Sequence, residues 1–264
     1  MNYHSDTWIN NKVKEHYVAA TQLIPDNYII SVTCQGSQNY GLDYEASDID
    51  TRCIFVPSIE NLILNNISSK THILPNNEHI DFHSVKHIVD IFLKQNINFL
   101  EILFSKYYIS NSVYWNILRS HAEEIATYDR NKFIKTCWGA ASNKYHKLYV
   151  GTQFEQDIVN KLGYSPKNFC HLLRIEEVMR RYIAGESFAD CLQTKQREFL
   201  MALKLGMFKV DSVEKLANDS FNHITAMANN MLPDEKKKNI KDMLYDVTIE
   251  IYKNAYKERR EKND

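Results

Sequence analysis

Residues 36–50 read GSQNYGLDYEASDID, and this stretch decides the fold. It opens with Gly36 and Ser37, directly after the β-rich run YIISVTCQ. Glycine lets a backbone turn sharply and approach a ligand closely, and a serine hydroxyl beside exposed N–H groups can donate to a phosphate. The stretch closes on Asp48 and Asp50. The order of these residues predicts a phosphate-binding turn, a spacer and an acidic strand.

The run DIDTRCIFVP is rich in β-branched residues and predicts a strand that carries the two aspartates. Residues two apart on a strand point to the same side, about 7 Å from each other. Two facing carboxylates repel unless a cation lies between them. Aspartate oxygens are the ligands that Mg²⁺ prefers, and Mn²⁺ also fits. Asp48 and Asp50 therefore predict a metal site.

A third carboxylate is expected from the next strand pair. KTHIL and EHIDFHS are separated by PNN, which suits a hairpin turn. In the second run, Asp81 alternates with the apolar residues Ile80 and Phe82 and so faces away from the core. Glu78 is the alternative, but it falls on the same face as Ile80. The spacing favours Asp81 as the third metal ligand and catalytic carboxylate.

Helical spacing begins near residue 84 and dominates the second half of the chain. The pattern predicts an α+β protein, with a small mixed sheet and flanking helices in residues 1–120 and a mainly helical domain in residues 121–264. Ser84 is a plausible N-cap, and Asn98 with Glu101 resembles a capping box. Later helices are predicted over residues 131–149, 166–184, 194–204, 211–231 and 235–260.

The predicted helix 166–184 carries a basic face. Lys167, His171 and Arg174 are spaced i, i+4 and i+7, and Arg181 continues the stripe. Such a face suits the phosphates of a nucleotide, because arginine offers a bidentate fork and lysine a point charge. A solvated face paired with Glu residues explains the spacing equally well.

Composition excludes several classes of protein. The net charge is -1, but residues 1–130 carry 9 Lys+Arg against 15 Asp+Glu, and residues 131–264 carry 23 against 18. The 5 cysteines show no zinc-binding spacing, so buried reduced thiols are expected. No apolar run is long enough for a membrane span, and no secretory signal is evident. We expect a cytoplasmic protein without membrane contact.

The motifs resemble those of the DNA polymerase beta-type nucleotidyltransferase superfamily. GSQNYGL...SDIDTRCIFVP, KQNINFLEILF and GYSPKNFCHLLRIEEVMRRYIAGE are similar to stand-alone nucleotidyltransferases of bacteria and phages, over roughly residues 28–210. The resemblance implies that the nucleotide-binding residues are Gly36, Ser37, Lys167, His171 and Arg174. It also implies that the metal-binding and catalytic residues are Asp48, Asp50 and Asp81.

The function expected from these residues is metal-dependent nucleotidyl transfer. A nucleoside triphosphate such as ATP would give its nucleoside monophosphate to an acceptor hydroxyl, and pyrophosphate would leave. The acceptor could be RNA, including tRNA, or a protein, because the fold does not fix it. The alternative is a non-catalytic nucleotide-binding regulator or an antitoxin-like partner module. A plain RNA-binding protein would need a more basic surface than the net charge indicates.

Overall fold

The computed structural model describes residues 4–64, 69–230, 232–233 and 237–261. These residues form two compact units. The first unit holds the β-sheet, its helices and the C-terminal helix α14 (Lys238–Glu261). The second holds the described residues between 129 and 233 together with Tyr40–Leu42. The predicted α+β class, with a mixed sheet early in the chain and a helical second half, is confirmed.

The sheet of the first unit has the strand order β3-β4-β2-β1-β5. Only the β2–β4 pair is parallel, and the other pairs are antiparallel. The strands span β1 (Ile29–Gln35), β2 (Asp50–Phe55), β3 (Lys70–Ile73), β4 (His79–Ser84) and β5 (Tyr108–Ile109). The predicted hairpin is present as β3 and β4, and Asn77 at φ 65° forms its turn.

The register of the sheet decides which polar side chains share a face. Gln35 of β1 lies opposite Asp50 of β2, and Arg52 of β2 lies beside Asp81 of β4. Residues paired across strands point to the same side of a sheet, as do residues two apart on one strand. One face of the sheet therefore carries these four polar side chains.

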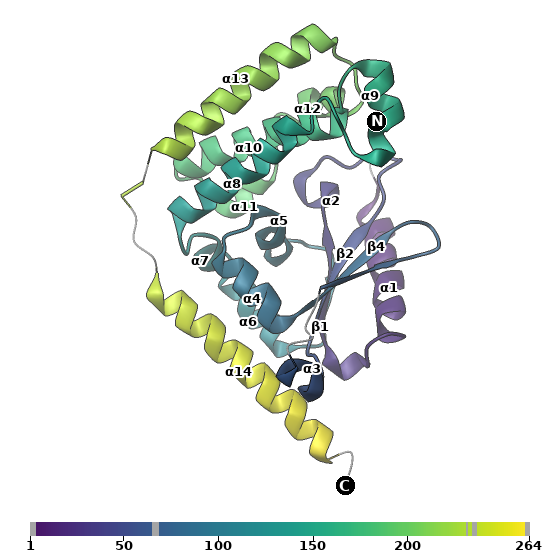
Figure 1. Cartoon of the computed structure of the whole chain (residues 1–264). Coiled ribbons are helices and arrows are strands. Elements are labelled where there is room, and N and C mark those ends of the chain that lie inside the picture. Colours follow the sequence, from purple (N-terminus) through teal and green to yellow (C-terminus); the bar gives the residue numbers. More distant parts are fainter. Residues whose placement is uncertain (1–3, 65–68, 231, 234–236, 262–264) are drawn as a thin grey trace. The chain divides into compact units, whose positions relative to one another are not determined.

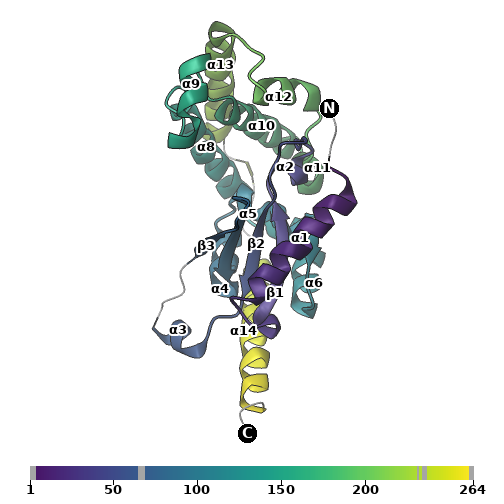
Figure 2. The same ribbon diagram turned by 90° about the vertical axis from the view of Figure 1, so that its right-hand side faces the viewer.

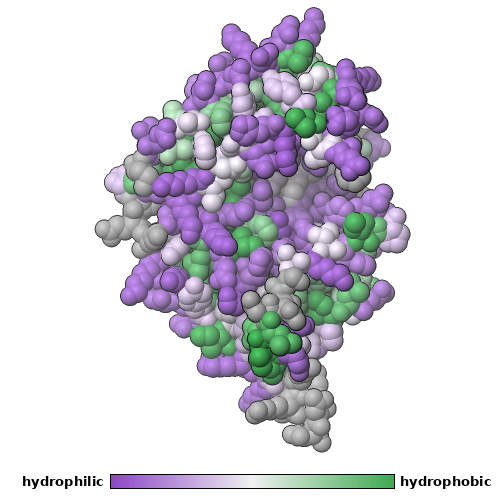
Figure 3. Space-filling model, viewed as in Figure 1, coloured by the Kyte–Doolittle hydropathy of each residue, from purple (hydrophilic) through white to green (hydrophobic). Residues whose placement is uncertain are grey.

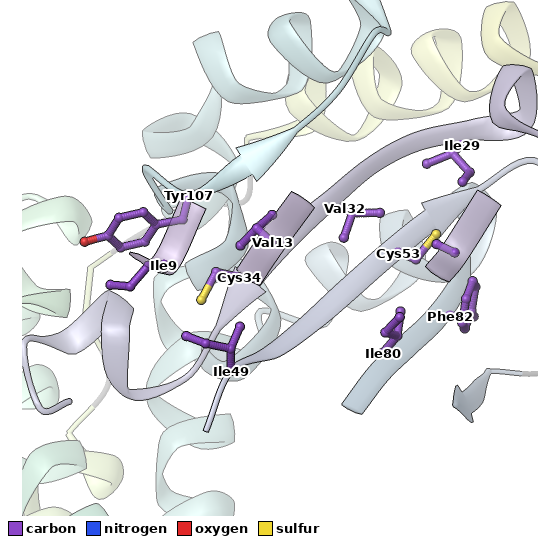
Figure 4. Packing of buried hydrophobic residues seen from close by; sticks show 11 residues of the cluster. Ile9, Val13, Ile29, Val32, Cys34, Ile49, Cys53, Ile80, Phe82 and Tyr107 are labelled. Carbon is purple, nitrogen blue, oxygen red and sulfur yellow. The ribbon is translucent and has the colours of Figure 1, made fainter. Parts of the chain in front are cut away.

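The opposite face forms the hydrophobic core with α1 (Asp6–Thr21). Figure 4 shows Ile9 and Val13 of this helix beside residues of the sheet that include Val32, Cys34 and Ile80. Helix α1 begins at Ser5, whose side chain accepts a hydrogen bond from the N–H of Trp8. The sequence patterns above do not predict this helix, which lies along the sheet in Figure 1.

Short helices follow the strands and cover the polar face of the sheet. Ser84 caps α4 as predicted, since its side chain accepts from the N–H of His87. Near the C-terminus, α14 returns to this unit, where the hydroxyl of Tyr256 donates to the carbonyl of Pro57 at 3.0 Å. Figure 2 shows α14 beside α4. The remaining helices of the unit are α2 (Ser37–Tyr40), whose Tyr40 belongs to the second unit, α3 (Ile59–Ile63), α4 (Val85–Leu93), α5 (Ile97–Leu100), α6 (Val113–Ser120) and α7 (Ala122–Ala126).

The second unit is built around α10, which packs against α8, α12 and α13. Ser165 caps α10 by accepting from the N–H of Asn168, and Pro166 occupies its first turn, as the sequence predicts. The predicted helices recur with shifted ends, and α9 and α11 are additional. The helices are α8 (Arg130–His146), α9 (Gln156–Leu162), α10 (Pro166–Ile183), α11 (Phe188–Leu192), α12 (Arg197–Lys204) and α13 (Val210–Asn229).

The surface view in Figure 3 is mostly hydrophilic, with an apolar group over α3. Ile63 and Leu64 at the end of that helix are strongly exposed. All five cysteines are free and buried, in agreement with the sequence. None of the described helices has the length and apolar character needed to span a membrane.

Candidate active site

The turn after β1 depends on a left-handed glycine. Gly36 has φ +93°, a conformation that a residue with a Cβ adopts only under strain. A Cβ built on it would meet nothing closer than Gln38 Oε1, at 4.0 Å. Conformation rather than crowding therefore requires the glycine. Ser37 follows at once as the half-buried first residue of α2.

Glu101 holds this turn from a distant part of the chain. Its carboxylate Oε1 accepts a hydrogen bond from the backbone N–H of Gly36 at 3.1 Å, and its side chain is almost fully buried. The expected capping box with Asn98 is wrong, because Asn96 is the N-cap of α5 and accepts from the Asn98 N–H. A charged acceptor strengthens a hydrogen bond, so Glu101 is a site residue that sequence reasoning missed.

The spacer between the two halves of the motif folds back on itself. The side-chain amide of Gln38 donates to the backbone carbonyl of Asp48 at 2.8 Å. The amide of Asn39 donates to the carbonyl of Cys34 at 2.9 Å, and both amide side chains are buried. These bonds tie the loop that carries Asp48 to the short helix that begins at Ser37.

Asp48 and Asp50 occupy different surroundings. The strand begins at Asp50, so Asp48 lies in the preceding loop and is exposed, rather than on the strand as expected. Asp50 Oδ1 accepts from the backbone N–H of His79 at 3.0 Å. Burial raises the pKa of the Asp50 carboxyl, and the charges of Asp48 and Asp81 raise it further. The other two predicted carboxylates are therefore close enough to Asp50 to act on it electrostatically.

Asp81 lies on the same face of the sheet as Asp50, and its carboxylate is oriented by two donors. Gln35 Nε2 donates to Oδ2 at 2.9 Å, and Thr71 Oγ1 donates to Oδ1 at 2.7 Å. Gln35 is itself the residue paired with Asp50 across the β1–β2 ladder. The polar residues at the ends of β1, β2 and β4 thus form one connected group.

Glu78, the alternative third carboxylate, serves a different purpose. It is buried, and its Oε2 lies 3.1 Å from His16 Nε2 and 3.4 Å from Lys12 Nζ. The other ring nitrogen of His16 lies 2.9 Å from Thr51 Oγ1. Burial alone would raise the pKa of Glu78, but the hydrogen bonds from His16 and Asn76 and the charge of Lys12 lower it. Glu78 joins α1 to the sheet, which leaves Asp81 as the better third carboxylate.

No group of three or more His, Cys, Asp or Glu side chains is arranged to hold a metal ion in the part of the chain that the structure describes. The donor chemistry still suits Mg²⁺ or Mn²⁺, because carboxylate oxygens are their ordinary protein ligands. Burial raises the pKa of Asp50, repulsion from Asp48 and Asp81 raises it further, and a cation would relieve that repulsion. The three carboxylates fit such a cation in charge and ligand type.

The basic face of α10 lies in the second unit and differs from the predicted surface stripe. Lys167 is exposed, His171 is half-buried, and Arg174 is only 2% exposed. The Arg174 guanidinium stacks on the ring of Tyr40, with its Cζ 3.7 Å from the ring centroid. Its Nε and Nη1 have no hydrogen-bond partner among the described residues. Arg174 is therefore a buried cation with N–H groups, at Nε and Nη1, that are not used as donors among the described residues.

Further cations surround this arginine. Burial lowers the pKa of His171 well below its usual value, and the charges of Arg174, Lys144 and Lys167 add to the shift. Burial and the charge of Lys167 likewise lower the pKa of Lys144. Lys204 also acts on His171, and its Nζ donates to the Leu42 carbonyl at 2.8 Å. Cations that disfavour one another's charge create a site that attracts an anion.

Arg181, the last member of the predicted stripe, has a structural role. Its guanidinium donates to the carboxylate of Glu186 at 2.9 Å and to the carbonyls of Gln193 and Asp190 at 2.7 Å each. These bonds join the end of α10 to α11 and satisfy the guanidinium. Arg181 does not belong to the anion-attracting group.

One comparison with known proteins bears on these residues. A model of the RlaP family, described as the RNA repair pathway DNA polymerase beta family, matches residues 9–183. The match covers more than half of the chain and takes in the Gly36 turn, the three carboxylates and helix α10. No curated protein sequence matches the chain. The match bears out the resemblance to polymerase beta-type nucleotidyltransferases.

Proposed function

Because the chain belongs to the RNA repair pathway DNA polymerase beta family, we propose that it is a metal-dependent nucleotidyltransferase. One observation carries the proposal. Asp50 and Asp81 share one face of the sheet, and Asp48 lies in the loop that Gln38 ties to the Gly36 turn. A phosphate-binding turn beside three carboxylates is suited to the transfer of a phosphate group.

Asp48, Asp50 and Asp81 would hold the divalent cation, Mg²⁺ or Mn²⁺. When bound, such a cation neutralises charge on phosphate oxygens and lowers the pKa of an acceptor hydroxyl. The hydroxyl attacks the α-phosphate of the nucleoside triphosphate, a new P–O bond forms, and pyrophosphate leaves. Asp81, whose carboxylate accepts from Gln35 and Thr71, would accept the proton of that hydroxyl.

The Gly36–Ser37 turn would receive phosphate oxygens of the nucleotide. The N–H of Gly36 is already engaged by Glu101, so a donor that this turn would offer is the hydroxyl of Ser37, which otherwise donates to Gln38 Oε1 over 3.5 Å. Gly36 then contributes the left-handed turn, and Glu101 keeps that turn in place. Glu101 would thus have a structural role, and its buried carboxylate would not itself contact the nucleotide.

The cations of α10 would bind phosphate oxygens as well. Lys167 offers an exposed point charge, and Arg174 offers two N–H groups that have no partner in the described part of the chain. His171, neutral at physiological pH because burial and neighbouring cations lower its pKa, could donate one hydrogen bond. We propose nucleoside triphosphate as the ligand of these residues.

RNA is the acceptor that we propose, tRNA among its forms. The family description names an RNA repair pathway, and that description is the support for the choice. A protein side chain is the other acceptor. Incubation with a nucleoside triphosphate labelled at its α-phosphate separates the two, because the label enters RNA in one case and protein in the other.

The decisive experiment compares label transfer by the wild type with transfer by Asp48→Asn, Asp50→Asn and Asp81→Asn. Each of these changes should lower the rate about 100-fold or more, because each removes a charge from the metal-binding group. Asp90→Asn is the matched control, since Asp90 pairs with Lys86 on α4 and should retain activity. Transfer that persists in all three site variants would refute the proposed site.

Glu78→Gln tests the choice of the third carboxylate. It should reduce stability through loss of the His16 contact while leaving the rate per folded molecule largely unchanged. The non-catalytic alternative has a separate test.

Calorimetric binding of a nucleoside triphosphate with Mg²⁺, without product from RNA or protein acceptors, would identify a nucleotide-binding module or partner protein.

A further inference from the structure

Helix α8 of the second unit is unusual in its charge. Residues 130–154, which include this helix, contain 5 Lys+Arg and no Asp or Glu. Residues 155–233, which form most of the rest of that unit, contain 10 Lys+Arg and 10 Asp+Glu. The net positive charge of the unit is therefore concentrated in one acid-free segment.

The solvent-facing side of α8 carries cations and an aromatic ring in line. Phe133, Ile134, Cys137 and Ala141 are the buried side, and α8 packs against α10 and α13. The opposite side, here called the α8 face, runs from residue 132 to residue 146, about 21 Å at the rise of an α-helix. It consists of Lys132, Lys135, Trp138, Gly139, Ser142 and His146.

Trp138 is an exposed indole held in a fixed orientation. It is 40% exposed, and its Nε1 donates to Thr225 Oγ1 of α13 at 3.2 Å. Of the other two tryptophans, Trp115 is fully buried and Trp8 stacks on His4. An indole that is held by a hydrogen bond at Nε1 and is 40% exposed is suited to stacking a base.

Gly139, next to this indole, leaves the helix backbone bare. Glycine is among the poorest helix formers, so a glycine in mid-helix calls for a reason. Crowding is not the reason, because a Cβ built at Gly139 would meet no atom within 4 Å. The open backbone instead allows a flat ligand to approach the side of the helix closely.

Among the described residues, no acidic side chain pairs with the exposed lysine of this face. Lys135 forms no ion pair within the described residues. Glu214 of α13 acts on Tyr149, just beyond the C-terminal end of the helix, where it helps burial to raise the pKa of the phenol. The acid thus borders the end of the segment, and the α8 face itself contains lysine, histidine, tryptophan and small polar side chains.

We propose that the α8 face binds single-stranded RNA, with a base stacked on Trp138 and a backbone phosphate on the exposed Lys135. The inference rests on the proposed function in one respect, the choice of RNA as acceptor. Stacking on an aromatic ring beside a line of cations is how proteins hold unpaired strands without reading their sequence. A membrane surface is a poorer match, since this face has no line of aliphatic side chains.

The test measures binding of a fluorescein-labelled oligoadenylate to the full chain by anisotropy, in EDTA and without nucleoside triphosphate. Trp138→Ala should weaken binding about 5- to 140-fold, the effect of removing one stacked base. Trp138→Phe should keep most of the affinity, because it retains a ring. Thermal melting of both variants checks that each is folded, and Trp138→Phe remains informative if the alanine variant is not.

Charge reversal gives a second readout. Lys135→Glu should lower affinity and reduce the slope of log K against log[salt] by at least about 0.7, the value of one single-strand phosphate contact. The control is Lys215→Glu, an exposed lysine of α13. If Lys135→Glu and Lys215→Glu have equal effects, or if Trp138→Ala binds as the wild type does, the proposal is overturned.

The design separates this proposal from the proposed function. Binding is measured without metal or nucleotide, so it does not depend on catalysis. Loss of transfer in Asp50→Asn together with unchanged binding in the α8 variants would refute the RNA surface and leave the enzyme proposal intact. Loss of binding in the α8 variants without transfer to any acceptor would support the RNA surface and refute the enzyme.

Discussion

Replacement of Glu101 by alanine should loosen the turn on which the proposed site depends. The change removes the carboxylate that accepts from the Gly36 N–H at 3.1 Å, and Glu101 is only 2% exposed. Loss of a hydrogen bond to a charged group costs about 1.5–3 kcal/mol. The lost methylene adds about 0.8 kcal/mol. We therefore expect Glu101→Ala to lower the free energy of unfolding by about 2–4 kcal/mol.

Glu101→Gln separates the hydrogen bond from the packing. Glutamine keeps an acceptor oxygen and the methylene groups, so the expected loss is about 1 kcal/mol or less. Glu124→Ala is the control, because Glu124 is exposed and pairs only with His121 among the described residues. Its removal should change stability by less than about 0.5 kcal/mol.

The assay is urea unfolding followed by far-UV circular dichroism, combined with hydrogen exchange of peptides that span residues 29–40. Exchange reports the turn directly, which matters because two units need not unfold together. Faster exchange at the turn is expected in Glu101→Ala and not in Glu101→Gln. Equal losses of stability in the two variants, or an unchanged turn in Glu101→Ala, would refute the role that we assign to this carboxylate.

Two glycines should respond to substitution in opposite directions. Gly36→Ala should destabilise the chain by about 1–2 kcal/mol, because φ +93° is strained for alanine although space is available. Thermal melting measures the loss of stability, and label transfer measures the effect on activity. A neutral Gly36→Ala would contradict the left-handed turn. Gly139→Ala should raise stability by about 1 kcal/mol, because it lies in mid-helix with open space, and yet weaken oligoadenylate binding. A stabilised Gly139→Ala variant with full RNA affinity would show that the bare backbone has no part in binding.

Local sequence patterns predicted the helices and strands that are stabilised by contacts between residues close together in the sequence. The hairpin of β3 and β4 follows from PNN between two β-rich runs, and the alternation around Ile80 and Phe82 places Asp81 on the polar face. Ser84 and Ser165 begin helices because a serine N-cap acts within three residues. In each case the sequence distance between cause and effect is short.

The contacts that assemble the site join residues far apart in the chain, and local patterns carry no signal for them. Glu101 contacts Gly36, 65 residues away in the sequence. Gln38 contacts the Asp48 carbonyl across a spacer whose conformation the sequence periodicity does not predict. Helix α1 could have been found, since Ile9, Val13 and Ala20 recur at helical spacing. His16 interrupts that apolar stripe, and its burial depends on Glu78 from β4.

Arg174 and Arg181 of α10 look alike in the sequence, but their contacts distinguish a proposed phosphate-binding residue from a structural one. Arg174 and Arg181 lie seven residues apart on one face, and both are 2% exposed. Arg181 is satisfied by Glu186 and two backbone carbonyls, so its burial is already compensated. Arg174 rests on the ring of Tyr40, and two of its nitrogens find no partner among the described residues. A buried guanidinium with unused donors costs stability unless an anion binds, which is the reason to expect a phosphate at Arg174 and not at Arg181.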